Sequence, residues 1–173
     1  QMDNFDTQII AQNLMEGANN FPLMAVPFFM LAGELMNAGG MSQRIVGIAQ
    51  SLVGQVRGGL GYVAILAATI VASISGSAVA DSAAVAALLI PMMRASGYNV
   101  PRSAGLIASA GIIAPIIPPS IPFVVFGVTT QLSITKLFLA GIVPGVLMGV
   151  SILIAWRLVS RHDKLETRPR PSV

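Results

Sequence analysis

Long uncharged stretches of apolar residues alternate along this chain with short polar joints. Residues 21–37 and 133–157 have the length and the apolar character of helices that cross a bilayer. Two further segments, residues 3–16 and 41–56, place apolar side chains on one helical face and polar side chains on the other. This pattern predicts an interfacial helix at the start of the chain and a second helix lying along the membrane surface.

Residues 58–94 contain two apolar runs separated by a polar, glycine-bearing break. The runs, 58–72 and 83–93, carry no charge. At a rise of about 1.5 Å per residue, each run is shorter as a helix than the roughly 30 Å hydrocarbon core of a bilayer. The break at residues 75–77 therefore predicts the tip of a re-entrant hairpin. Because irregular backbone at that depth is tolerated only when buried in protein or lining a water-filled cavity, the tip is a candidate site.

Residues 101–132 form a second interrupted segment. No charge lies between Arg102 and Lys136, yet four of the eight residues from 115 to 122 are proline. Proline removes an amide donor and does not fit a regular helix interior. The pattern predicts a discontinuous crossing, in which two half-helices are joined by an extended, proline-rich kink whose carbonyls are left free in the middle of the membrane.

The last apolar segment carries two further signals. Gly141, Gly145 and Gly149 recur every fourth residue, which places them on one helical face and predicts a close-packing surface for another helix. Trp156 is followed by Arg157 at the end of the segment, an arrangement typical of an anchor at the membrane interface.

Composition and charge place the chain in the membrane. Of its 173 residues, 54% are hydrophobic and only 10% are charged, whereas soluble domains carry about 25% charged residues. We therefore expect an all-α integral membrane protein.

Every basic residue except Lys136 falls on one side of the predicted topology, which the positive-inside rule assigns to the cytoplasm, with residues 158–173 as a cytoplasmic tail or linker. These charges mark segment ends, so we expect no nucleic-acid partner. The chain opens without an initiator Met or a signal-peptide pattern, and we expect it to be an internal piece of a longer protein.

The two interruptions, at residues 75–77 and 115–122, contain groups that could bind an ion. Unwound backbone carbonyls and serine hydroxyls can replace the hydration shell of a sodium ion without burying several charges. Asp81 is the only acid between Arg57 and Arg94, and ionisable residues inside membranes are usually functional. The alternative is that the serines are small packing residues and that Asp81 pairs with an arginine or caps a helix.

Four sequence blocks resemble the large membrane subunit of tripartite ATP-independent periplasmic (TRAP) transporters. They are residues 28–37 (FFMLAGELMN), 75–85 (SGSAVADSAAV), 89–93 (LIPMM) and 113–122 (IAPIIPPSIP). The resemblance implies an elevator-type ion transporter fold, of which this chain looks like the first of two inverted halves. It implies a scaffold part at 1–57 with an arm helix at 41–56, a transport-domain part at 58–132, and a further transmembrane helix at 133–157.

The resemblance also implies a function and a set of site residues. It implies sodium-coupled import of an organic acid across the bacterial inner membrane, with a small membrane subunit and a periplasmic substrate-binding protein as partners. The acid is commonly a C4-dicarboxylate or a sialic acid, and the sequence looks nearest to the sialic acid members. The implied sodium ligands are Ser75, Gly76, Ser77, Asp81, Ala114, Pro115, Pro118, Pro119 and Ser120. Ser77 and Ser120 are also implied to face the substrate.

Two other function classes compete with this interpretation. A channel-like or purely structural membrane subunit could use the same hairpin without coupling transport to an ion. An intramembrane hydrolase would require an activated nucleophile, but the two interrupted intramembrane segments, 58–94 and 101–132, hold no His or Lys and only one aspartate. We therefore expect a protein that is not an enzyme.

Overall fold

The computed structural model describes residues 7–75 and 77–161, and every regular element in that part of the chain is an α-helix. A helix is present at each segment where the sequence pattern predicts one, which confirms the all-α class. In chain order the helices are α1 (Thr7–Ala18), α2 (Phe21–Ala38), α3 (Met41–Val53), α4 (Gly59–Ser75), α5 (Ala78–Ala95), α6 (Val100–Gly111), α7 (Ile121–Thr130) and α8 (Ile134–Ser160).

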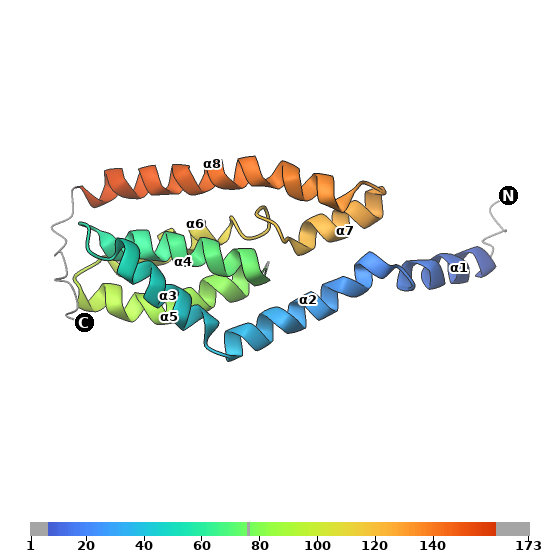
Figure 1. Cartoon of the computed structure of the whole chain (residues 1–173), viewed down its shortest axis with the longest axis horizontal. Helices are drawn as coiled ribbons and strands as arrows, with labels where there is room; N and C mark the ends of the chain where they lie inside the picture. The colour runs from blue at the N-terminus through green and yellow to red at the C-terminus, as the bar shows by residue number, and fades with distance from the viewer. Residues whose placement is uncertain (1–6, 76, 162–173) are drawn as a thin grey trace.

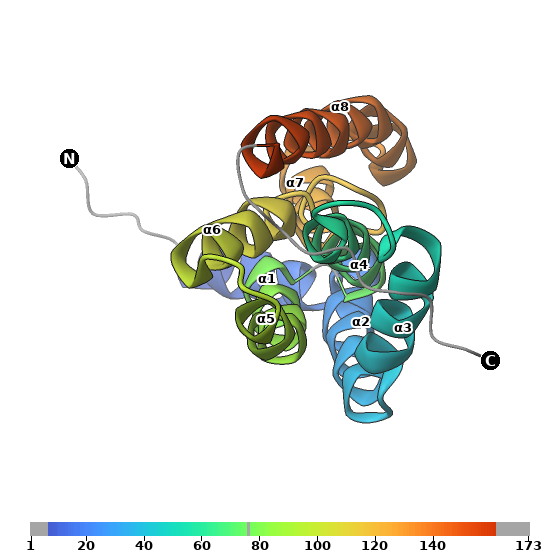
Figure 2. The ribbon, with the colours of Figure 1, turned by 90° about the vertical axis from the view of Figure 1, so that its left-hand side faces the viewer.

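The helices form an elongated bundle organised around α4. Helices α4 and α5 are an antiparallel hairpin, α6 and α7 form one interrupted path beside it, and α8 runs along both (Figure 1). Seen from the end at which α4 begins, α4 lies among α3, α5, α6 and α8, and it packs against each of them (Figure 2). The buried residues of α4 are mostly small or β-branched, such as Val63, Ala64, Ala67 and Ala68, which lets its neighbours approach closely.

Three described helices are long and apolar enough to cross a membrane: α2 and α5, with 18 residues each, and α8, with 27 residues. The prediction that both hairpin arms are too short was therefore wrong for α5. That helix begins at Ala78 and continues through Pro91 to Ala95, so it is longer than the uncharged run from 83 to 93. The polar residues Asp81 and Ser82, which lie between the two uncharged runs, are in its first turns.

The position of the hairpin tip, rather than the length of its arms, supports a re-entrant arrangement. The tip lies level with the break between α6 and α7, and α8 continues past it alongside α7 (Figure 1). At that far end Gly127 of α7 lies against Ile134 and Leu137 of α8. Both ends of the hairpin lie at the opposite end of α8, where its last turns meet the start of α4.

The glycine face of α8 packs against the break within this same chain. Gly141 and Gly145 are buried, and a Cβ added to Gly141 would overlap the Ile116 carbonyl and the Phe123 ring. A Cβ on Gly145 would lie 2.6 Å from Cγ1 of Ile117. The predicted close-packing surface is thus confirmed at Gly141 and Gly145 but not at Gly149, where a Cβ would lie 3.9 Å from Cδ1 of Ile113. Its partner is the irregular segment between α6 and α7 together with the start of α7, and not another regular helix alone.

Trp156 joins the last turns of α8 to the base of the hairpin. Its indole Nε1 donates a hydrogen bond of 3.0 Å to the carbonyl of Gly58, and its ring stacks on Tyr98 with a centroid separation of 6.2 Å. Only 4% of Trp156 is exposed, so the side chain is a packing residue and not the interfacial anchor that its position predicted. The ring lies directly over Gly61.

This packing predicts that Gly61→Ala destabilises the protein. The new Cβ would overlap the buried indole of Trp156, and overpacking of this kind costs about 1–3 kcal/mol. We expect a lower thermal unfolding midpoint for the full-length permease that contains this chain. Gly105→Ala is the matched control, because nothing lies within 4 Å of a Cβ at that helical position. Equal stability of the two variants would contradict the packing described.

Candidate ion site at the hairpin tip

Asp81 lies at the start of α5 and is almost completely buried, with 1% of its surface exposed. The helix is capped by Ser77, whose side chain accepts a 3.4 Å hydrogen bond from the Ala80 amide. The Asp81 amide donates to the Ser77 carbonyl at 3.0 Å. Ser77 is thus the capping residue of α5, and Asp81 lies in the first turn, near the positive end of the helix dipole.

The first turns of α5 pack against the end of α6. A Cβ added to Gly111, the last residue of α6, would overlap the Ser82 hydroxyl and lie 3.3 Å from the Ala78 carbonyl. Asp81 is therefore the neighbour in sequence of Ser82, which contacts the last residue of α6. The interrupted crossing begins to unwind at that residue. The sequence analysis did not single out Gly111 or Ser82. The available signal was a glycine immediately before the proline-rich segment, where close approach of another helix requires a small residue.

The segment from 112 to 120 is more ordered than an extended kink. The amides of Ile113 and Ala114 donate to the carbonyls of Ala110 and Gly111 at 3.2 and 3.0 Å. The amides of Ile116 and Ile117 both donate to the carbonyl of Ile113, at 3.0 and 3.1 Å. The chain therefore continues in tight turns beyond α6 before the helical path is lost.

Ser120 closes the far side of the break. It is 1% exposed, its hydroxyl donates a 2.6 Å hydrogen bond to the Pro115 carbonyl, and it accepts a 3.4 Å bond from the Phe123 amide at the start of α7. The prediction that the kink leaves its carbonyls free was therefore wrong for Pro115, because the Ser120 hydroxyl folds back onto it. That carbonyl retains a second lone pair, since an sp² oxygen accepts twice.

Other carbonyls of the break remain available as neutral oxygen ligands. Within the described part of the chain, those of Ala114, Pro118 and Pro119 accept no hydrogen bond. Ala114 is fully buried, whereas Pro118 is half-buried and Pro119 is exposed. These oxygens and one carboxylate have the chemistry of a site for a hard monovalent cation, in which a single charge balances the ion.

The structure brings together some of the residues predicted as sodium ligands. Ser77 and Asp81 share the start of α5, next to the end of α6, from which Ala114 follows by one turn. Pro115 and Ser120 are bonded to each other. The side chain of Ser75 and the whole of Gly76 lie outside the described residues. Among the residues described, no group of three or more His, Cys, Asp or Glu side chains could hold a metal ion.

Comparison with known proteins gives one family. The model of the tripartite ATP-independent periplasmic transporter, DctM component, matches residues 1–173. Among individual proteins, the chain is 65% identical over 155 residues to the 2,3-diketo-L-gulonate TRAP transporter large permease protein YiaN of Escherichia coli, covering 90% of this chain and 36% of that protein.

Two further relatives are named for other substrates. The chain is 41% identical to the C4-dicarboxylate TRAP transporter large permease protein DctM of Pseudomonas aeruginosa, over 95% of this chain and 38% of that protein. It is also 41% identical to the sialic acid TRAP transporter large permease protein SiaM of Vibrio cholerae, over 94% of this chain and 38% of that protein. The chain thus spans less than two fifths of the length of each of these three relatives.

The hydrogen bonds of Ser120 predict that Ser120→Ala loosens the start of α7. The variant loses a helix cap, which is worth about 0.5–2 kcal/mol, and leaves the Pro115 carbonyl without its donor. We expect amide hydrogen exchange over residues 115–124 to accelerate by roughly tenfold in the full-length protein. Ser109→Ala is the control, since the exposed Ser109 hydroxyl bonds only the carbonyl of Gly105, within its own helix. Unchanged exchange in Ser120→Ala would refute the assigned role.

Proposed function

Because this chain belongs to the DctM component family of tripartite ATP-independent periplasmic transporters, we propose that it is part of a permease that imports an organic acid across the bacterial inner membrane. The chain would supply one of two inverted halves of the permease, and the remainder of the longer protein would supply the other. The match of the family model to the whole chain carries this proposal. The three apolar helices of spanning length support it.

We further propose that a sodium ion is co-transported and binds at the tip of the α4–α5 hairpin. The observation that carries this step is the burial of Asp81 in the first turn of α5, where Ala78 and Ser82 pack against the end of α6. Ionisable residues buried in membrane proteins commonly mark ion pathways, and the Asp81 carboxylate would supply the negative charge that balances the sodium ion. The Ser77 hydroxyl and the open carbonyls of the break would complete the ligand set, with Ser75 and Gly76 as further members.

We propose an elevator mechanism, with residues 58–132 as part of the moving transport domain. The mutual packing of α4, α5 and α6 supports their moving as one group with α7. Helix α8 contacts this group at two places, through Trp156 on Gly58 and through Gly141 and Gly145 on the break. Residues 1–57 would belong to the scaffold, with α3 as the arm that frames the moving part.

The proposed partners are a small membrane subunit on the scaffold and a periplasmic binding protein that delivers the substrate. Helix α2 leaves large apolar side chains exposed, including Phe21, Phe28, Leu31 and Leu35. An exposed apolar surface of this kind is covered in a membrane by lipid or by another helix. This supports a scaffold helix that faces lipid and a neighbouring subunit.

The substrate class is proposed from the three relatives named above, although a further relative, 44% identical, is an isethionate permease, whose substrate is a sulfonate. 2,3-Diketogulonate, C4-dicarboxylates and sialic acid are all carboxylates, so we propose a carboxylate substrate. The identity of 65% to the diketogulonate permease exceeds the 41% to the sialic acid and C4-dicarboxylate permeases. A keto sugar acid is therefore the first substrate to test, ahead of sialic acid. Ser77 and Ser120 remain the residues of this chain proposed to face it.

The proposed coupling predicts that Asp81→Asn weakens the sodium dependence of uptake. The amide keeps the size of the side chain but removes the charge that balances the cation. We expect the sodium concentration for half-maximal uptake to rise about tenfold or more, a loss of ~1.4 kcal/mol or more in ion affinity. The measurement is uptake of labelled 2,3-diketogulonate into proteoliposomes that contain the full-length permease, its small subunit and its binding protein.

Glu34→Gln is the matched control, because Glu34 is an exposed acid on α2, outside both the hairpin and the break, and the sodium dependence of this variant should equal that of the wild type. Wild-type sodium dependence in Asp81→Asn would place the ion site elsewhere. Wild-type uptake that requires no sodium gradient would reject the coupling and favour a channel-like subunit. Sodium-dependent uptake of sialic acid or of a C4-dicarboxylate, but not of the keto sugar acid, would reject only the substrate.

A further inference from the structure

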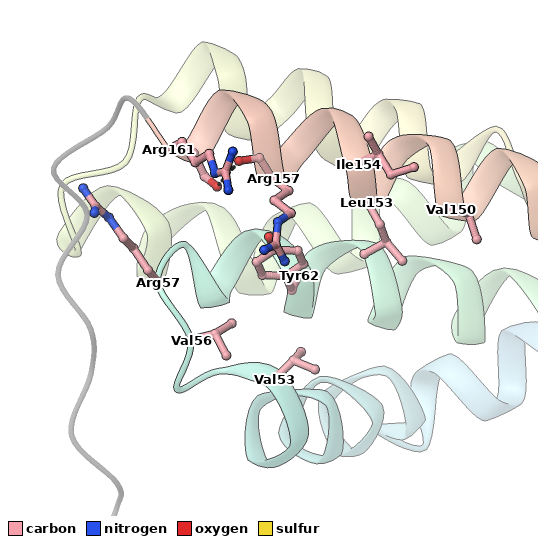
Figure 3. A pocket seen from close by; sticks show the side chains of 10 residues that line it. Val53, Val56, Arg57, Tyr62, Val150, Leu153, Ile154, Arg157 and Arg161 are labelled. Atoms are coloured by element: carbon pink, nitrogen blue, oxygen red, sulfur yellow. Dashed lines mark hydrogen bonds between the residues drawn. The ribbon is translucent and has the colours of Figure 1, made fainter.

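A groove of about 620 Å³ opens between α3, α4 and α8, at the end of the bundle where α4 begins and α8 ends. Its walls are apolar where it runs toward the middle of the bundle. They are formed there by Val53 on one side and by Val150, Leu153 and Ile154 on the other (Figure 3). Along α8 the groove extends from residue 150 to residue 161, roughly 16 Å at the rise of an α-helix.

The mouth of the groove is strongly basic. Arg57 precedes α4, and Arg157 and Arg161 lie at the end of α8; all three are exposed. The side chain of Arg157 extends across the groove toward Tyr62 of α4 (Figure 3). The Arg57 side chain points away from the other two (Figure 3). The guanidinium groups of Arg157 and Arg161 are suited to an anion with several oxygens, because each presents a planar set of N–H donors.

The charged mouth and the apolar walls of the groove are arranged one after the other along the membrane normal. Arg94, at the end of α5, and Arg102, at the start of α6, lie at the same end of the bundle, whereas Lys136 lies at the other end of α8. The positive-inside rule places this basic end at the cytoplasmic face. The arginines therefore lie at headgroup level, and the apolar walls run from them into the hydrocarbon region.

We propose that this groove binds one anionic phospholipid, with its phosphate at Arg157 and Arg161 and an acyl chain along Leu153 and Ile154. Basic pockets between transmembrane helices on the cytoplasmic side have the charge and the position for acidic lipid headgroups. The order of charge followed by apolar surface matches a phospholipid, whereas a soluble anion would use only the mouth. This inference goes beyond the proposed transport activity and does not depend on its substrate or its coupling ion.

The test compares lipid retention by variants of the full-length permease. The protein is incubated in detergent with equal amounts of phosphatidylglycerol and phosphatidylcholine, and bound lipid is counted by native mass spectrometry. We expect the wild type to retain phosphatidylglycerol preferentially. Arg157→Gln with Arg161→Gln should reduce that retention roughly tenfold or more. Arg94→Gln with Arg102→Gln removes the same formal charge at the same end, outside the groove, and should leave retention near the wild-type level.

A second pair of variants tests the apolar wall without changing charge. Ile154→Trp would fill the groove and should expel the lipid, while Ile142→Trp, at an exposed position on the same helix outside the groove, should not. Equal losses in the two arginine pairs would overturn the proposal in favour of general surface charge. Equal binding of phosphatidylcholine, or displacement of phosphatidylglycerol by excess inorganic phosphate, would also overturn it. Retention that survives Ile154→Trp would reject the groove as the site.

Discussion

Backbone groups inside a bilayer find no water with which to bond, and this constraint governs how the two interruptions of the chain are built. At the hairpin tip Ser77 caps α5, and in the proline-rich segment the Ser120 hydroxyl folds back onto Pro115 while tight turns satisfy the preceding carbonyls. Among the described residues, the carbonyls of Ala114, Pro118 and Pro119 accept no hydrogen bond, and those of Ile112, Ile116 and Ile117 are open as well. Open backbone oxygens in a break that follows α6, against which the start of α5 packs, suit a cation site.

Close helix approach is the second requirement, and glycine provides it at each junction. Gly141 and Gly145 let α8 press against the irregular segment, Gly111 admits the first turns of α5, and Gly61 accommodates the ring of Trp156. Side chains at these positions would push the hairpin, the break and α8 apart. The site is therefore held by backbone proximity more than by specific polar contacts, which suits a group of helices that moves together.

The sequence predicted those features that depend on neighbouring residues. Uncharged runs and proline positions were sufficient for the hairpin and the interrupted crossing, and the four-residue spacing of glycines predicted the packing face of α8. The length of α5 was misjudged because Ser77 caps a helix that then tolerates Asp81 in its first turns. Contacts between distant residues were out of reach: the indole of Trp156 bonds a carbonyl 98 residues away. The arginine-lined groove likewise joins two segments far apart in the chain, and no local pattern predicts it.

The central claim is that the hairpin tip and the break act together as one ion site, and hydrogen exchange in sodium against potassium tests it most directly. The measurement is made on the full-length permease, without substrate, over residues 75–82 and 112–120. The account predicts that sodium slows exchange in both segments together and leaves the middle of α8 unchanged. Sodium-dependent protection confined to other regions, or none in either segment while transport remains sodium-driven, would contradict it.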